Sequence, residues 1–233
     1  MEAANPETRI DAYIRNVANA LVQIEREGVK NDVVEIARAY LKDSIYYLSR
    51  GDQFNALATI AYAEGLLDAL RLLGIAQFNW SKTDDLIRRA QNKVFVAGTF
   101  EIIHPGHIAY LRHAWTLGRV VAVIARDSTV RRIKNRDVII PERQRLEVVS
   151  NIVYVHKARL GYEDDMFRVV EEERPNIILL GPNQPFNENS LREELRKRGL
   201  GNIEVVRFND YVDCPLCSTT RILKAISNRF NQG

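Results

Sequence analysis

The sequence predicts two parts, a small all-helical bundle followed by an α/β domain built on a doubly wound parallel sheet. Residues 1–74 repeat apolar side chains at helical spacing, whereas short β-prone runs alternate with helical stretches from residue 93 onward. These runs are continuously apolar, which is typical of parallel strands covered by helices on both faces. We therefore expect a helical domain over 1–74, a linker over 75–92 and an α/β domain over 93–233.

Three helices are expected in the first domain. The first begins at Pro6, and the second begins at Asp32, which resembles a capping box because Glu35 lies three residues later. The third spans residues 52–73. Because a bundle this short has a limited core and gains from a partner surface, we expect it to make the protein a homodimer.

Five strands are expected in the second domain, over residues 93–97, 120–125, 152–156, 176–180 and 203–208. Helical stretches separate them, beginning near His107, Pro141, Asp164 and Glu188, and a last one follows Thr220. A short helix is also expected between Ser81 and residue 92. In this architecture ligands bind at the carboxyl ends of the strands.

Composition narrows the class of protein. The 233 residues are 46% hydrophobic, and 33 basic against 30 acidic side chains leave a net charge of only +3. This small excess gives no reason to expect a nucleic-acid partner. No apolar run approaches the roughly 18 residues that span a bilayer, and the first residues lack a signal pattern. We therefore expect no membrane partner and a cytoplasmic location.

Cys214 and Cys217 are the two cysteines of the chain, so a disulfide framework cannot be the basis of the fold. Their C-x-x-C spacing supplies half of a structural zinc site, which His113 and His156 could complete if the fold brought them close. The plainer alternative is two thiols on an ordered loop. Because the pair directly precedes Ser218, we predict that oxidation disturbs the loop that follows and makes activity redox-sensitive.

The segment from Gly98 to His107 joins the first expected strand to a helix and carries His104 and His107. A helix N-terminus offers unpaired N–H groups and a positive dipole end, and glycines before it let an anion approach the backbone. The imidazoles add further donors. Metal binding by this histidine pair and a purely structural role are the alternatives, but phosphate chemistry fits the pattern best.

Gly98-Thr99-Phe100 followed by His104-Pro105-Gly106-His107 resembles the signature of the cytidylyltransferase-like nucleotidyltransferase superfamily, whose fold is Rossmann-like. Further segments occur in the order expected of that family: Arg126-Asp127, Lys134-Asn135-Arg136, Pro141-Glu142 with Gln144-Arg145, Leu160-Gly161, Leu180-Gly181 with Gln184, and Ser218-Thr219-Thr220-Arg221. The resemblance covers about residues 93–226. The spacing is most similar to that of archaeal FAD synthases. The N-terminal bundle resembles a small archaeal helical domain of unknown function, especially within residues 51–69.

The resemblance implies transfer of a nucleoside monophosphate from a nucleoside triphosphate, ATP or CTP, to a phosphorylated acceptor, with Mg²⁺ as cofactor and pyrophosphate released. It implies catalytic roles for His104, His107 and Lys134, and acceptor contacts for Glu101 and Arg145. It implies no metal ligand from the protein. Nucleotide contacts are implied at matching positions: Gly98, Thr99, Phe100, Gly106, Arg126, Asp127, Gly181, Asn183, Gln184, Ser218, Thr219, Thr220 and Arg221.

Three residues depart from the family pattern. Glu101 stands where aspartate is usual, and Asn183 stands where the similar FAD synthases carry an acidic residue, so both bear on the choice of acceptor or nucleotide. Asn135 replaces a glycine, which is less disruptive because asparagine tolerates positive φ better than most residues.

Adenylylation of FMN is therefore the first expected reaction, and cytidylyl transfer to glycerol 3-phosphate or a similar phosphorylated alcohol is the second. A non-catalytic nucleotide-binding regulator is the alternative outside enzymes. A relative of class I aminoacyl-tRNA synthetases also places two histidines at a helix start, but the chain has no KMSKS-like segment and little room for tRNA recognition.

Overall fold

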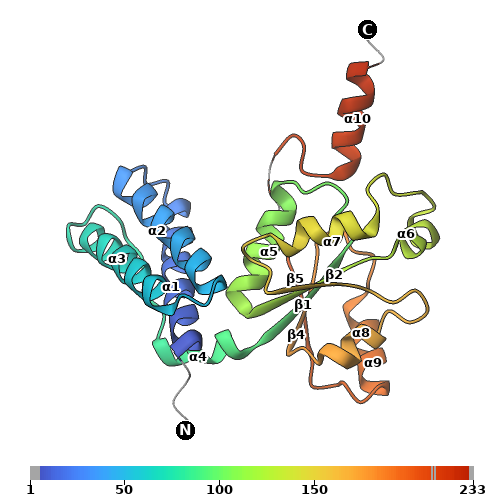
Figure 1. The fold of residues 1–233 in the computed structure, drawn as a ribbon, viewed down its shortest axis with the longest axis horizontal. Coiled ribbons are helices and arrows are strands. Elements are labelled where there is room, and N and C mark those ends of the chain that lie inside the picture. The colour runs from blue at the N-terminus through green and yellow to red at the C-terminus, as the bar shows by residue number, and fades with distance from the viewer. Residues whose placement is uncertain (1–5, 211, 213, 231–233) are drawn as a thin grey trace. The chain divides into compact units, whose positions relative to one another are not determined.

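A computed structural model describes residues 6–210, 212 and 214–230. The chain divides into two compact units, residues 1–91 and 92–233 (Figure 1). None of the described helices is long and apolar enough to cross a membrane.

Four helices form the first unit: α1 (Pro6–Arg26), α2 (Asp32–Ser49), α3 (Gln53–Leu72) and α4 (Thr83–Gln91). The first three fall where the sequence placed them. The cap of α2 is Asn31 rather than Asp32, because the Asn31 side chain accepts a hydrogen bond from the Val33 N–H at 2.8 Å. Ser44 donates to the Ala56 carbonyl at 2.7 Å and so ties α2 to α3.

The segment expected as a linker packs on this helical unit. Phe78 and Leu86 are buried, and the Trp80 indole donates to Asp68 of α3 at 2.8 Å. The Asn79 N–H donates to the Gln23 side chain of α1, and α4 packs along α1. These apolar side chains could not stay in water at low cost, so residues 75–91 extend the bundle instead of forming an open connection.

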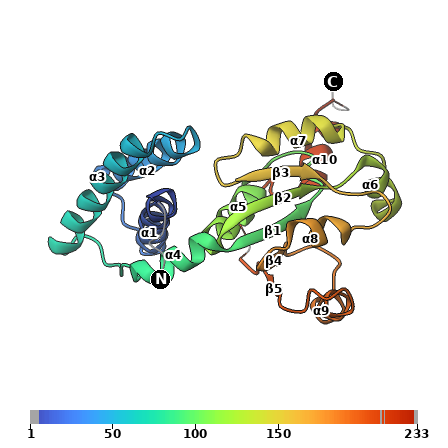
Figure 2. The same ribbon diagram turned by 60° about the horizontal axis from the view of Figure 1, so that its bottom comes forward.

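The second unit contains a five-stranded parallel sheet, shown in Figure 2, made of β1 (Lys93–Gly98), β2 (Arg119–Ile124), β3 (Lys157–Leu160), β4 (Ile177–Leu180) and β5 (Glu204–Arg207). The strand order is β3-β2-β1-β4-β5 with every pair parallel. This order reverses between β1 and β4, which confirms the doubly wound α/β fold.

One expected strand is wrong. Residues 152–156 form turns, and β3 begins only at Lys157. The strand lies at the edge of the sheet, where water reaches it, so it carries Lys157 and Arg159 instead of a continuous apolar run. Both cations pair with Glu173, at 2.6 and 2.9 Å.

Helices cover both faces of the sheet, as right-handed crossovers require. On one side lie α5 (Pro105–Leu117) and α7 (Glu142–Ser150), and on the other lie α8 (Arg168–Glu173) and α9 (Glu188–Lys197). Phe95, Val123 and Ile178 belong to the core beneath α8 and α9. Two more helices, α6 (Asp127–Lys134) and α10 (Thr219–Phe230), begin beyond the carboxyl ends of β2 and β5.

Candidate active site

The loop after β1 has a tightly constrained backbone. Phe100 adopts φ +48°, and its ring folds back over Gly98, where an added Cβ would lie 2.9 Å from the ring. Glycine is therefore required at position 98 by packing. His104 then caps α5 with its backbone alone and leaves its side chain free of capping contacts.

The His104 and His107 rings stack on each other with their centroids 3.8 Å apart. The Nδ1 atom of each ring is buried and has no hydrogen-bond partner among the residues described. Burial lowers the pKa of both histidines, and that of His107 falls to about 3 with a further contribution from His104. Both imidazoles are therefore neutral at neutral pH, and each keeps a buried ring nitrogen without a partner among the described residues.

Lys134 reaches this loop from the last turn of α6. Its Nζ donates to the Thr99 hydroxyl at 2.9 Å. Partial loss of water around the ammonium, and then the charge of Arg136, lower the pKa of Lys134. Asn135 ends the helix in the left-handed conformation, with φ +49°, which confirms the interpretation of asparagine at that position.

Glu101 is buried and fastens the segment after α6 to the loop. Its two carboxylate oxygens accept hydrogen bonds from the Arg136 guanidinium and from the Ile139 N–H, at 2.5 and 2.7 Å. Burial raises the pKa of Glu101, but these hydrogen bonds outweigh burial, so the net shift is downward. The carboxylate is ionised and its oxygens are engaged within the protein.

Arg145 lies fully buried beneath the same loop. Its guanidinium donates to the carbonyls of Thr99, Ala125 and Ile140 and to the carboxylate of Asp127. Asp127 and Glu142 also accept hydrogen bonds from each other's backbone N–H groups. Arg145 thus joins the ends of β1 and β2 to the start of α7, and these contacts give it a positioning role.

The other predicted residues also gather at the strand ends. Gln184 accepts from the Gly181 N–H at 3.0 Å and donates to the Ala97 carbonyl, which ties the end of β4 to β1. Arg126 pairs with Glu142 and Glu163, at 3.0 and 3.2 Å, but its buried Nε has no partner among the residues described.

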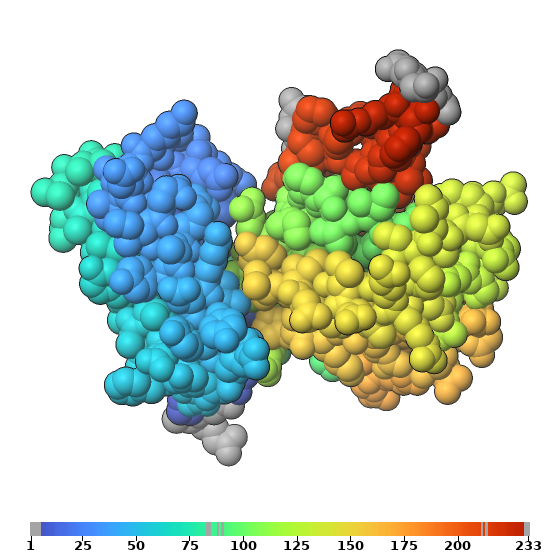
Figure 3. Space-filling model, turned by 45° about the horizontal axis from the view of Figure 1, so that its top comes forward, coloured from blue at the N-terminus to red at the C-terminus, as the bar shows by residue number. Residues whose placement is uncertain are grey.

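The last predicted segment begins α10, and Ser218 accepts from the Arg221 N–H at 3.2 Å as a helix cap. A Cβ added at Gly106 would lie 3.6 Å from the Cys217 carbonyl oxygen, so this loop runs beside the start of α5. Figure 3 shows the C-terminal segment, in red, against the green of α5. Thr219 and Thr220 lie in the first turn of α10, after the loop.

Cys214 and Cys217 are joined by a disulfide. No group of three or more histidine, cysteine, aspartate or glutamate side chains in the described part of the chain could hold a metal ion. The zinc site considered above therefore finds no support in the described residues. Instead the His156 ring accepts a hydrogen bond from the Val120 N–H at 3.1 Å.

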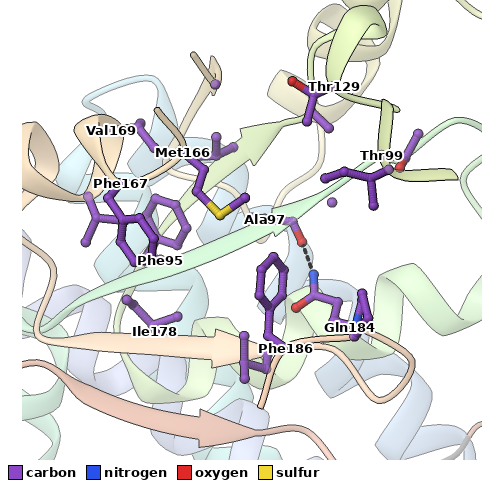
Figure 4. A pocket seen from close by; sticks show the side chains of 18 of the residues that line it. Phe95, Ala97, Thr99, Thr129, Met166, Phe167, Val169, Ile178, Gln184 and Phe186 are labelled. Carbon is purple, nitrogen blue, oxygen red and sulfur yellow. Dashed lines mark hydrogen bonds between the residues drawn. The ribbon is translucent and has the colours of Figure 1, made fainter. Parts of the chain in front are cut away.

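A cavity of about 270 Å³ opens beside Thr99 and Lys134 and runs between the sheet and α8 (Figure 4). Its walls are largely apolar and include Phe95, Met166, Phe167, Ile178 and Phe186. The sequence did not reveal it, because an apolar residue lining a cavity has the same pattern as one packed in a core. Asn183 and Gln184, which were predicted to contact the nucleotide, are among the residues that line it.

Comparison with known proteins agrees with this geometry. Residues 95–225 match the family described as cytidylyltransferase-like, and residues 12–76 match a protein family of unknown function, DUF357. The FAD synthase of Archaeoglobus fulgidus is 52% identical over 134 residues, which are 57% of this chain and 96% of that protein. The FAD synthase of Methanothermobacter thermautotrophicus is 51% identical over 137 residues, 57% of this chain and 89% of that protein.

Among solved structures, the lipopolysaccharide core biosynthesis protein from Thermoplasma volcanium is similar, with a TM-score of 0.50 and 39% identity over 52% of this chain and 98% of that one. The matched family model spans more than half of the chain and contains the histidine pair, the Lys134 contact and the start of α10. The protein therefore belongs to the cytidylyltransferase-like family, and it is a nucleotidyltransferase.

Proposed function

We propose that this protein is an FAD synthase, which transfers the AMP group of ATP to FMN and releases pyrophosphate. A phosphate oxygen of FMN attacks the α-phosphorus, a new P–O–P bond forms, and the bond to the β-phosphate breaks as pyrophosphate leaves on the opposite side. The reaction needs alignment and charge stabilisation rather than a covalent nucleophile. Relatives about half identical over nearly their whole length support this choice of substrates.

The histidine pair carries the proposal. Two neutral imidazoles at the start of α5 each keep a buried Nδ1 without a partner among the described residues. An unsatisfied buried nitrogen is costly unless a ligand meets it. As hydrogen-bond donors, His104 and His107 would stabilise the negative charge that grows on the α-phosphate oxygens, beside the positive end of the α5 dipole.

Lys134 and the start of α10 would hold the rest of the reacting phosphates. Lys134 already lies 2.9 Å from the Thr99 hydroxyl, so its ammonium can move from that hydroxyl to a phosphate oxygen. Thr219 and Thr220 would bind the β- and γ-phosphates through the N–H groups that a helix start leaves free. Arg221 would bind them through its guanidinium, because its N–H already donates to Ser218.

Magnesium fits this site as part of the substrate. Glu101 and Asp127, two carboxylates at this edge of the sheet, have their oxygens bonded to Arg136, Arg145 and backbone N–H groups. Magnesium usually keeps several waters and is held largely through substrate phosphates. We therefore expect Mg²⁺ to enter bound to ATP, without a dedicated protein ligand.

The departures from the family pattern do not favour the non-catalytic alternative. Glu101 is one of the two residues that supported this alternative. Its carboxylate keeps the loop in place through Arg136 and Ile139. The side chain is longer than the usual aspartate, yet the backbone at Glu101 has no positive φ. Asn183, the other such residue, lines the cavity, to which neither histidine of the pair contributes.

Chromatography of FAD formed from ATP and FMN tests the proposal, with CTP and glycerol 3-phosphate as the competing pair. His104→Ala and His107→Ala should each lower kcat by about 100-fold or more, because each removes a charge-stabilising donor. His113→Ala, on the same helix but against Phe208, is the matched control and should keep full turnover. Faster turnover of CTP with glycerol 3-phosphate, or unchanged rates in both variants, would refute the assignment.

A further inference from the structure

Beyond its opening at Thr99 and Lys134, the cavity under α8 has no part in the phosphate chemistry described above. Its walls come from three neighbouring strands and from α8, as Phe95, Val123, Ile178 and Val170 show. Figure 4 places the rings of Phe95, Phe167 and Phe186 around one space, with the Met166 thioether over it. A largely apolar pocket lined by aromatic rings and a thioether suits a flat aromatic ligand.

Two polar side chains that line the cavity each have a buried atom without a partner among the described residues. The Thr129 Oγ1 and the Arg126 Nε are buried without a hydrogen bond to any described residue, and both side chains line the cavity. The Nδ1 atoms of His104 and His107 are likewise buried without a partner among the described residues. Because native structures rarely leave buried polar groups unsatisfied, Thr129 and Arg126 are suited to hydrogen bonds with a ligand that enters the cavity.

The reaction geometry decides which substrate the cavity faces. In an in-line displacement the acceptor oxygen and the leaving pyrophosphate lie on opposite sides of the α-phosphorus. The starts of α5 and α10, proposed to hold the triphosphate, adjoin each other through Gly106 and Cys217. The cavity opens at Thr99 and Lys134 toward α8, on the other face of the sheet from α5. The attacking phosphate therefore approaches from the cavity side.

We propose that this cavity binds the aromatic ring system of the acceptor, so that its phosphate emerges at Thr99 and Lys134. This inference rests on the proposed function, for which the ring is the isoalloxazine of FMN. The hydrocarbon edge of the ring packs inward against Phe95 and Phe167. The ring's nitrogen and oxygen atoms face Thr129 and Arg126, which supply the missing hydrogen bonds.

The test separates the ring from the phosphate by using riboflavin, which has the same ring and no phosphate. Its binding to the full-length protein is followed by quenching of flavin fluorescence, without ATP. Two variants alter the cavity: Met166→Ala removes an exposed wall residue, and Thr129→Val replaces a hydroxyl that has no protein partner by a methyl group. Neither removes a hydrogen bond that the structure shows within the protein.

Each variant should raise the Kd of riboflavin and the KM for FMN about fivefold, as expected for a lost contact of about 1 kcal/mol. The KM for ATP should stay within about twofold in the same assay. Thr129→Ser keeps the hydroxyl and should retain tighter binding than Thr129→Val. Val148→Ala, an exposed apolar truncation on α7 outside the cavity, should change none of these values.

A rise in the KM for ATP with unchanged riboflavin binding would overturn the inference and assign the cavity to adenine. If neither the KM for ATP nor riboflavin binding changed, the inference would also be overturned, and the cavity would be unfilled space in the core. Failure of the wild-type protein to convert FMN into FAD would refute the proposed function instead. In that case, weaker riboflavin binding in Met166→Ala and Thr129→Val would still support an aromatic-ring site, and unchanged binding would reject it.

Discussion

Acid should destabilise the second unit, residues 92–233, through His107. This unit carries the histidine pair and is called the catalytic unit below. Its pKa is lowered to about 3 in the folded protein by burial and by His104, against an ordinary value of 6.5. Between these two pH values, the His107 side chain carries a proton in the unfolded chain but not in the folded one. The stabilising contribution of the neutral ring is fully present above pH 6.5 and is lost as the pH falls toward 3.

The magnitude follows from the difference between the two pKa values. Each pH unit below 6.5 removes about 1.4 kcal/mol, so the wild-type protein should lose about 2 kcal/mol between pH 7 and pH 5 through this group. The total approaches about 5 kcal/mol below pH 3. His107→Gln has no titrating group at this position, so its free energy of unfolding should fall by about 2 kcal/mol less over the same interval.

Urea unfolding at pH 7 and pH 5 measures this difference. Because the two units can unfold separately, each needs its own signal. In a Trp80→Phe background the remaining tryptophan, Trp115, reports on the catalytic unit. In a Trp115→Phe background, Trp80 reports on the helical unit, and all four histidines of the chain lie outside that unit.

The pH effect of His107→Gln should appear in the Trp115 signal and be absent from the Trp80 signal. Equal loss of stability in wild type and variant between pH 7 and pH 5 would mean that His107 takes up its proton normally in the folded state. The argument for two neutral imidazoles as phosphate ligands would then fail with it.

Three further outcomes are expected. Arg145→Met should lower the free energy of unfolding of the catalytic unit by about 3 kcal/mol, measured by urea unfolding, because it leaves three half-buried carbonyls and Asp127 without their donor. A normal stability with a raised KM for FMN would instead support the acceptor contact predicted from sequence. Mild oxidation should lower the FAD-forming activity of the reduced wild-type protein and leave that of the Cys214→Ser, Cys217→Ser double variant unchanged; equal sensitivity in both would exclude the C-x-x-C pair as the cause. Light scattering should give a dimer for the full chain and a monomer for residues 92–233, since residues 75–91 pack on the helical unit. A shorter chain that still forms a dimer would reject the helical unit as the dimerising element.

Apolar patterning predicted most of the fold because most strands lie in the middle of the sheet. The strands β1, β2 and β4 are buried on both faces, and their continuous apolar runs marked them within a residue or two. β3 was misplaced because edge position lets it carry charges, while the apolar residues before it pack in turns. α6 was missed because its basic surface conceals a single buried anchor, Val130.

The candidate site was predictable where chemistry is concentrated in a short segment. His104, His107 and Lys134 stand out by residue type, and the fold places them at one edge of the sheet. The roles of Glu101 and Arg145 depend on partners that lie as far as 38 and 46 residues away in the sequence, respectively, which no local pattern encodes. The cavity was hidden for a related reason, since its lining is shared between elements and looks like core.

The histidine pair and the cavity depend on the same loop, and this explains why so many contacts restrain it. Thr99 is joined to Lys134 through its hydroxyl and to Arg145 through its carbonyl, and Glu101 holds the segment that follows α6. A shift of about 1 Å in this loop would move the attacking phosphate, the imidazoles and the ammonium relative to one another, and misplacements of that size can cost about 100-fold in rate. Buried ion pairs such as Arg145 with Asp127 contribute little net stability, but they fix one arrangement of the loop. In a reaction that uses no covalent nucleophile, that fixed arrangement is the protein's main contribution to catalysis.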